Sequence, residues 1–210
     1  MKPLGAIYKD VFFRKRHTLH WRAPIFCQAV IDVLNPKSVI DVGCATGDLV
    51  RQFRQMGVPC EGLEGSPHAL KHSVIKNTFV HDLRTPLPYP MRFNEVKYEW
   101  FDLVICLEVF EHIELEYVKV FLNNLDYLGL GEILASIAGP GQGGHYHVNL
   151  QLMEYWDKLF LDLGYIRKQE IADRVKKSIY DWRSRPGIRA FYHNLVYYEK
   201  SFLKTTPCCP

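Results

Sequence analysis

The strongest constraint on the fold is a strand, a glycine turn and a helix that follow one another directly over residues 38–56. Residues 38–42 (SVIDV) form an apolar run typical of a buried strand, and the GCATG sequence after them predicts a tight turn. Asp48 then favours the start of a helix. This order opens a βαβ unit, so we expect a parallel sheet flanked by helices.

The same alternation continues through the rest of the chain. Residues 101–107 (FDLVICL) are apolar almost throughout, which is typical of a central parallel strand covered on both faces. Ser66 with Pro67, and Asn149, have the composition of helix starts and caps. The other strands that we expect are 59–63, 78–80, 131–138, 165–171 and 191–198, and the other helices are 23–34, 115–125 and 150–163. This pattern favours a doubly wound α/β fold.

Composition places the chain among ordinary soluble globular proteins. Its 210 residues suit one domain with decorations, and the net charge of +3 is too small to indicate a nucleic-acid partner. The six cysteines form no C-x-x-C pair, so we expect free thiols in a reducing compartment. The chain shows neither a signal-peptide core nor an apolar run of about 20 residues. We therefore expect a cytoplasmic protein with no membrane partner, and the oligomeric state stays open.

Polar and glycine-rich segments follow the predicted strands. In doubly wound sheets, ligands bind beyond the carboxyl ends of the strands, so these segments should together form the site. Asp41 at the first turn favours a cationic ligand, and Glu64 comes 23 residues later, near the offset of about 20 at which an acid reaches ribose hydroxyls. The spacing Gly43-x-x-x-Gly47 matches neither the three-glycine dinucleotide fingerprint nor the triphosphate loop. These residues predict that the ligand is a cation that carries a ribose but no phosphate.

Three sequence motifs resemble those of one enzyme family and follow one another in the order typical of that family. Residues 39–47 (VIDVGCATG) resemble the first motif of class I S-adenosylmethionine-dependent methyltransferases, and residues 62–67 (GLEGSP) resemble the second. Residues 101–113 (FDLVICLEVFEHI) resemble the fourth strand and the helix after it. The resemblance implies a Rossmann-like sheet of seven strands, mostly parallel, with a reversed last strand. It places the methyltransferase domain at residues 37–203, between an N-terminal helical flank or lid (1–36) and a flexible tail (204–210).

The resemblance also implies the ligands and their binding residues. S-adenosylmethionine would be the cofactor and S-adenosylhomocysteine the product. Gly43 and its neighbours would hold the methionine part, Glu64 the ribose hydroxyls, and Asp82 with the Leu83 amide the adenine edge. The start of the helix at Asp48 would help to hold the cofactor carboxylate. The implied cofactor-binding set is Asp41, Gly43, Gly47, Glu64, Asp82, Leu83, Leu107 and Glu108.

Two histidines are the candidate catalytic residues. Methyl transfer needs the acceptor held against the methyl group, and a hydroxyl acceptor also needs a base for its proton. His112 follows the fourth strand, and His147 follows the glycine-rich loop after the fifth, so both should border the methyl group. His145 should turn differently from His147 if this segment is extended. We predict O-methylation of a small-molecule or sugar-like (glycan-like) acceptor.

Two alternative functions belong to other classes of protein. Glu108, Glu111 and His112 would share one helix face, and with His147 they resemble the metal cluster of small-RNA 3′-terminal 2′-O-methyltransferases. We do not favour a divalent metal, because E-V-x-E-H-I also occurs in metal-free relatives that methylate small molecules. A non-catalytic cofactor-binding scaffold is disfavoured by the intact cofactor motifs. The basic stretch 174–189 with its aromatic residues could contact RNA, but a solvated face is the favoured interpretation.

Overall fold

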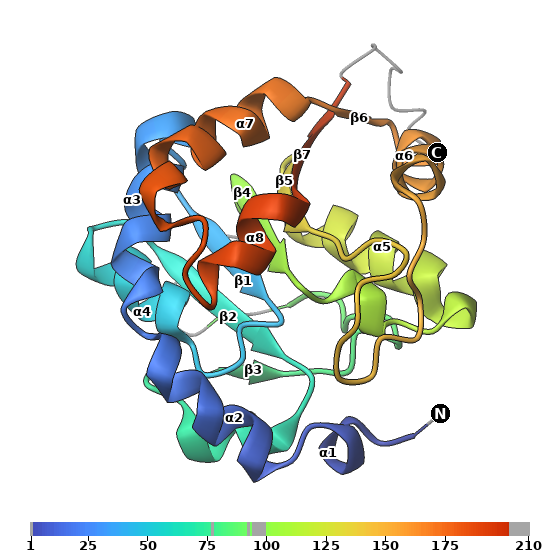
Figure 1. Cartoon of the computed structure of the whole chain (residues 1–210). Coiled ribbons are helices and arrows are strands. Elements are labelled where there is room, and N and C mark those ends of the chain that lie inside the picture. The colour runs from blue at the N-terminus through green and yellow to red at the C-terminus, as the bar shows by residue number, and fades with distance from the viewer. Residues whose placement is uncertain (1, 77, 92, 94–99, 202–210) are drawn as a thin grey trace.

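The computed structural model describes residues 2–76, 78–91, 93 and 100–201. A seven-stranded sheet runs through the molecule in the order β3-β2-β1-β4-β5-β7-β6, with helices on both of its faces (Figure 1). Its strands are β1 (Val39–Val42), β2 (Cys60–Glu64), β3 (Phe79–Val80), β4 (Leu103–Leu107), β5 (Glu132–Ser136), β6 (Tyr165–Arg167) and β7 (Leu195–Lys200). Only β7 runs antiparallel to its neighbours β5 and β6. The Rossmann-like sheet with a reversed last strand is therefore confirmed.

Helices and short 3-10 turns connect the strands. The α-helices are α1 (Leu4–Ile7), α2 (Asp10–Arg16), α3 (Arg22–Leu34), α4 (Asp48–Gln55), α5 (Val118–Leu128), α6 (Met153–Asp162), α7 (Gln169–Ser178) and α8 (Ile188–Asn194). The 3-10 turns are η1 (His17–Leu19), η2 (Pro67–His72), η3 (Phe110–His112), η4 (Leu115–Tyr117) and η5 (Tyr180–Trp182). Among these described helices, none has the length and apolarity needed to cross a membrane.

The central strand β4 divides the apolar core into two layers. Val104 and Cys106 pack into the cluster beneath α5 and α6, whereas Leu103 and Ile105 pack into the cluster beneath α3, α4 and α7. Successive side chains of a strand point to opposite faces, so both faces of β4 must be covered by helices. The continuous apolar run 101–107 correctly predicted this arrangement.

The last third of the chain departs from the sequence prediction. The strand expected at 165–171 ends at Arg167, and α7 begins at Gln169. The first four residues of the strand expected at 191–198 instead complete α8. Both segments carry apolar residues at spacings that fit a strand or a helix, and their packing against the sheet decides between them.

Neither expected cap forms. Ser66 precedes η2, but its hydroxyl donates to the backbone oxygen of Tyr8 at 2.9 Å instead of capping the turn. The helix expected at 150–163 begins only at Met153, and the buried Asn149 accepts a hydrogen bond from Gln151 at 3.0 Å. Both polar side chains thus stabilise loops near the carboxyl end of the sheet rather than helix ends.

The N-terminal segment packs across the carboxyl ends of the first strands. Asp10 in α2 pairs with His68 at 2.9 Å and with Lys71 at 3.5 Å, both in η2. Arg84, which follows β3, donates to the backbone oxygen of Lys2 at 2.7 Å. The segment is thereby fixed beside the strand ends, where the site was expected. The predicted boundaries of domain and flank stay predictions, and the expected tail 204–210 lies outside the described residues.

Candidate active site

A pocket opens at the carboxyl ends of β1, β2 and β4. Seven of the eight residues predicted to bind the cofactor line it: Asp41, Gly43, Glu64, Asp82, Leu83, Leu107 and Glu108. Gly47 is the exception: it precedes α4 with φ +79°, and a Cβ there would lie 2.6 Å from Cγ1 of Ile75. Of the two candidate histidines, His112 lines the pocket and His147 does not, and the N-terminal segment and α8 complete the walls. The structure therefore joins the predicted cofactor residues in one site.

The turn after β1 requires glycine at position 43. Gly43 has φ +79°, a conformation that other residues rarely adopt, and a Cβ there would lie 2.4 Å from Cγ2 of Val109. Its amide and that of Cys44 both donate to the backbone oxygen of Leu63, at 2.8 and 3.1 Å. The turn is thus held against the end of β2, and its backbone faces the pocket.

Glu64 joins the two loops that form the floor of the pocket. Its Oε2 accepts the Ala45 amide at 2.9 Å, and its Oε1 accepts the Ser66 amide at 2.7 Å. Burial raises the pKa of the Glu64 carboxyl, while these backbone amides act in the opposite direction. A carboxylate with both oxygens fixed in this way keeps its remaining lone pairs for a ligand hydroxyl.

Two other acids differ in their surroundings. Burial raises the pKa of Asp41 to about 7, although the nearby Arg22 acts to lower it. Asp82 is bound by Arg84, whose Nε and Nη2 donate to its two oxygens at 2.9 and 2.7 Å. Arg84 also donates to Glu114 at 3.0 Å, so Asp82 belongs to an ion-pair network at the edge of the pocket.

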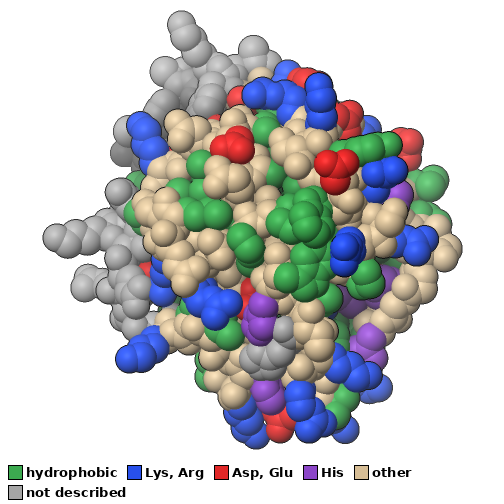
Figure 2. Space-filling view, turned by 60° about the vertical axis from the view of Figure 1, so that its left-hand side comes forward, with side chains coloured by type: hydrophobic (Ala, Val, Ile, Leu, Met, Phe, Trp, Pro, Cys, Tyr) green, Lys and Arg blue, Asp and Glu red, His purple; other side chains and the backbone are tan. Residues whose placement is uncertain are grey.

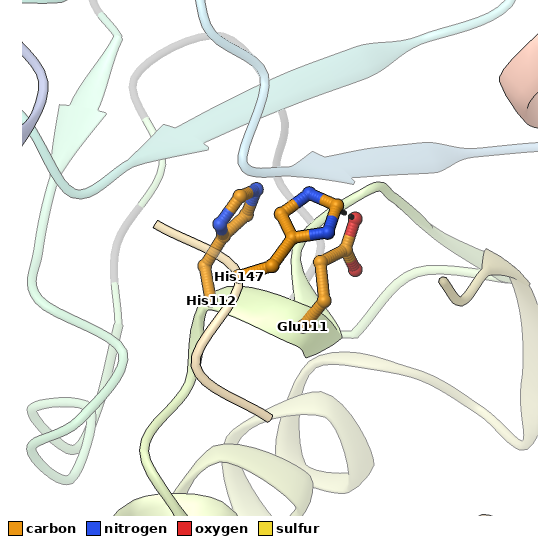
Figure 3. Close-up of side chains that lie close together, drawn as sticks. All are labelled: Glu111, His112 and His147. Carbon is orange, nitrogen blue, oxygen red and sulfur yellow. Dashed lines mark ion pairs between the residues drawn. The ribbon is translucent and has the colours of Figure 1, made fainter. Parts of the chain in front are cut away.

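The two candidate histidines lie side by side with their ring centres 5.0 Å apart (Figure 3). Nδ1 of His112 donates to the backbone oxygen of Tyr146 at 3.0 Å, and Nδ1 of His147 donates to that of Gln142 at 3.0 Å. Since a carbonyl can only accept, each neutral ring carries its proton on Nδ1 and keeps a lone pair on Nε2. Burial lowers the pKa of His112 to about 4.

Glu111 completes this cluster from the preceding position in η3. Within the described part of the chain, neither of its buried carboxylate oxygens has a hydrogen bond of standard geometry, although the backbone amides of Glu111 and Ala138 lie close enough to act on its pKa. Oε1 lies 3.9 Å from Nε2 of His147. Burial, followed by repulsion from Glu108, raises the pKa of Glu111 to about 8. Glu111, His112 and His147 each offer one ligand atom within 4.8 Å of the others.

Glu108 does not join this cluster. We expected it to share a helix face with Glu111 and His112, but it precedes η3, with φ 56°, and only one 3-10 turn forms. Its Oε1 accepts from Ser136 at 2.8 Å and from Asn194 at 3.2 Å. The carboxylate is therefore turned toward β5 and the end of α8, and the expected helical arrangement is wrong.

His145 turns differently from His147, but residues 145–146 form a turn, with Tyr146 at φ 58°, and not the extended segment on which this expectation depended. Its Nε2 donates to the backbone oxygen of Ile7 at 3.1 Å, and its ring lies near Tyr8 and Phe12. His145 therefore anchors the N-terminal segment. That segment, expected only as a flank or lid, also supplies pocket residues that were not predicted to bind the cofactor: Leu4, Tyr8, Phe12, Phe13, Arg16 and Arg22. No known motif spans them, and the basic and aromatic composition of the segment was their only signal.

The aromatic rings of the basic stretch after α7 are partly exposed, and arginine side chains of the same stretch lie over them. Arg183 lies 3.7 Å from the ring centre of Tyr180, and Arg185 lies 5.6 Å from that of Trp182. On the face in Figure 2, Lys and Arg side chains are spread among apolar and acidic ones rather than gathered in one stripe. This distribution agrees with the solvated face that we favoured over an RNA-binding one.

The pocket fits a sulfonium-bearing nucleoside. Buried carboxylates suit a positive charge and ribose hydroxyls, and the tight turn at Gly43 brings backbone close to the ligand. Sheet order and site together define a class I S-adenosylmethionine-dependent methyltransferase. The chain belongs to the methyltransferase-domain family, whose model matches residues 19–177.

Solved structures show the same fold at low sequence identity. Magnesium protoporphyrin IX methyltransferase (ChlM) from Synechocystis PCC 6803, with bound SAM, is 20% identical with TM-score 0.53, over 80% of this chain and 81% of that one. The plantazolicin methyltransferase BpumL, in complex with SAH, is 14% identical with TM-score 0.55, over 89% and 86%. The methyltransferase domain of bacterial CtHen1 is 17% identical with TM-score 0.53, over 71% and 88%. No curated protein sequence matches this chain significantly.

Proposed function

We propose that the protein methylates a hydroxyl oxygen of a small-molecule or sugar-like acceptor, with a histidine of the pair as base. The observation that carries this proposal is the shared orientation of His112 and His147, each of which donates Nδ1–H to a backbone oxygen. Bound S-adenosylmethionine supplies an electrophilic methyl group. The histidines supply the proton acceptor that a hydroxyl needs during transfer.

Of the two, His147 is the better base. Burial lowers the pKa of His112 to about 4, so His112 binds a proton only weakly and is suited to orient the acceptor hydroxyl. His147 lies 3.9 Å from the Glu111 carboxyl, which stabilises the imidazolium in its ionised form. Nε2 of His147 takes the hydroxyl proton as the oxygen bonds to the methyl carbon, and the electron pair of the broken C–S bond stays on sulfur.

The test compares labelled methyl transfer with cofactor binding. Tritium-labelled S-adenosylmethionine is incubated with metabolite and oligosaccharide fractions, and the linkage in any product is determined. We expect an O-methyl product from the wild type, a loss of about 10²-fold or more in His147→Asn, and unchanged affinity for S-adenosylhomocysteine in that variant. A nitrogen or carbon linkage in the product, or full activity of His147→Asn, would contradict the proposal.

The cluster of Glu111, His112 and His147 favours a second candidate, metal-assisted methylation of the 2′-hydroxyl at an RNA 3′ end. Metal-bound histidines commonly donate their other ring nitrogen to a backbone oxygen, as both rings do here. The buried carboxylate without a partner also suits a divalent cation. These three side chains would hold the ion, which would polarise the hydroxyl.

Titration with Mg²⁺, Mn²⁺ or Zn²⁺ separates the two candidates. The metal-assisted function requires stoichiometric binding that Glu111→Gln abolishes, and methylation that a chelator stops. On an RNA oligonucleotide it would leave a 3′ end that resists periodate. Activity that survives extensive chelation would leave only the histidine base.

A further inference from the structure

Two arginines of the N-terminal segment reach the cofactor pocket. Arg16 ends α2, and Arg22 begins α3, so the short linker through η1 brings both guanidinium groups to one wall. Arg22 lies with its guanidinium carbon 4.6 Å from the ring centre of Phe191, and its Nη1 donates to the backbone oxygen of Gly187 at 3.2 Å. Arg16 lies 4.7 Å from the ring centre of Phe12. These contacts position the two guanidinium groups and leave most of their N–H hydrogen-bond donors free for a ligand.

These positive charges lie near carboxylates but form no ion pair with them. Among the described residues, neither guanidinium has a carboxylate in direct contact, and Nε of Arg22 is buried without a hydrogen-bond partner. Burial and then repulsion from Arg16 lower the pKa of Arg22 to about 10, and burial also lowers the pKa of Arg16, while nearby carboxylates such as Asp48 act in the opposite direction on both. Two like charges are therefore kept near each other in a desolvated pocket. An anion in direct contact with both guanidinium groups would offset the cost of burying them.

The start of α4 already carries a negative charge. We expected this helix end to help hold the cofactor carboxylate, but the carboxylate of Asp48 lies in its first turn. Oδ2 of Asp48 accepts from the Thr46 hydroxyl at 2.8 Å, and Oδ1 pairs with His20. A second carboxylate there would face a like charge.

We infer that Arg16 and Arg22 form the carboxylate-binding end of the cofactor site. The methionine part of the cofactor ends in an ammonium and a carboxylate. Asp41, buried beside Arg22, would accept the ammonium, and the two guanidinium groups would bind the carboxylate. The N-terminal segment is then part of the binding site and not only a flank. This inference concerns the cofactor, so it stands or falls independently of the acceptor and of His147.

The experiment uses two ligands that differ at this end. S-adenosylhomocysteine carries the carboxylate, whereas 5′-methylthioadenosine lacks the whole amino-acid part. By calorimetry on the full-length protein, Arg22→Met and Arg16→Met should each weaken S-adenosylhomocysteine binding by about tenfold to hundredfold. Binding of 5′-methylthioadenosine should change less than twofold. Arg14→Met is the matched control, because Arg14 is exposed on the same helix, and it should change neither affinity.

Decarboxylated S-adenosylmethionine isolates the carboxylate itself. The wild type should bind it about tenfold to hundredfold more weakly than S-adenosylmethionine, and Arg22→Met should no longer distinguish the two. Arg22→Lys keeps the charge and replaces the methionine variant if that variant is unstable. It should weaken the binding of S-adenosylhomocysteine several-fold and leave the binding of 5′-methylthioadenosine unchanged. Equal losses for S-adenosylhomocysteine and 5′-methylthioadenosine, or no loss for either, would overturn the inference.

Discussion

The ring of His147 occupies the space that a side chain at Gly144 would need. A Cβ at Gly144 would lie 2.0 Å from Nε2 of His147 and 2.3 Å from its Cε1. Because Nδ1 of the same ring donates to Gln142, the glycine-rich loop holds His147 from two sides. The loop thus positions the histidine that we propose as the base.

Gly144→Ala should therefore impair catalysis without impairing cofactor binding. The added methyl group displaces the ring by more than an ångström, which is enough to cost about 10²-fold in kcat. The dissociation constant for S-adenosylhomocysteine should stay within twofold, since Gly144 does not line the cofactor pocket. Gly143→Ala is the control, because a Cβ at Gly143 meets nothing within 4 Å. Equal activity of the two variants would show that the position of His147 does not matter.

Glu64→Gln should weaken both cofactor binding and the fold. One oxygen becomes an amide nitrogen, which cannot accept from the Ala45 or Ser66 amide and leaves a buried N–H without a partner. We expect a loss of about 1–3 kcal/mol in the free energy of unfolding, measured with urea, and at least tenfold weaker S-adenosylhomocysteine binding. Glu154→Gln, an exposed change on α6, should alter neither. Wild-type behaviour of Glu64→Gln in both measurements would remove Glu64 from the site.

Cofactor affinity should rise with pH because of Asp41. Burial raises the pKa of Asp41 to about 7, and only the ionised form accepts the ligand ammonium strongly. Binding should therefore release a proton, and the affinity for S-adenosylhomocysteine should increase by about tenfold between pH 6 and pH 8. Asp41→Asn should bind weakly at both values with little pH dependence. A flat profile in the wild type would contradict the role of Asp41.

The same pKa predicts the pH dependence of stability without ligand. Between its ordinary pKa of 3.8 and about 7, Asp41 keeps its proton in the native state, whereas the unfolded chain releases it. The free energy of unfolding should therefore fall as pH rises through this window, and Asp41→Asn should reduce the fall. Urea titrations of both proteins at pH 5 and pH 7.5 measure it. An equal fall in the variant would mean that other groups cause it.

S-adenosylhomocysteine should protect the N-terminal segment from trypsin. Arg14 and Lys15 are exposed on α2, while Phe12, Phe13 and Arg16 of the same helix line the pocket. A ligand held by these residues stabilises the closed segment, so cleavage at α2 should slow several-fold. Cleavage at Lys37, exposed at the amino end of β1, provides the control. Unchanged cleavage at α2 under saturating ligand would show that the segment does not respond to the cofactor.

The sequence predicted best those elements whose determining residues lie within a few positions of one another. The apolar run of β4 and the turn at Gly43 have requirements within a few residues, so both could be predicted from local pattern, whereas the reversed last strand and most cofactor residues came from the family resemblance. The orientation of Glu108 could not, because it depends on Ser136 and Asn194, which are far along the chain. The arginine wall was missed for the same reason, since Gly187 and Phe191 position Arg22.

The hydrogen bond from Arg22 to Gly187 spans 165 residues of sequence. During synthesis, the first five strands can pair before α8 leaves the ribosome, but this wall of the pocket cannot yet exist. The first five strands must therefore pair without help from the small-molecule ligand, and high-affinity binding begins only once α8, followed by β7, has been synthesised.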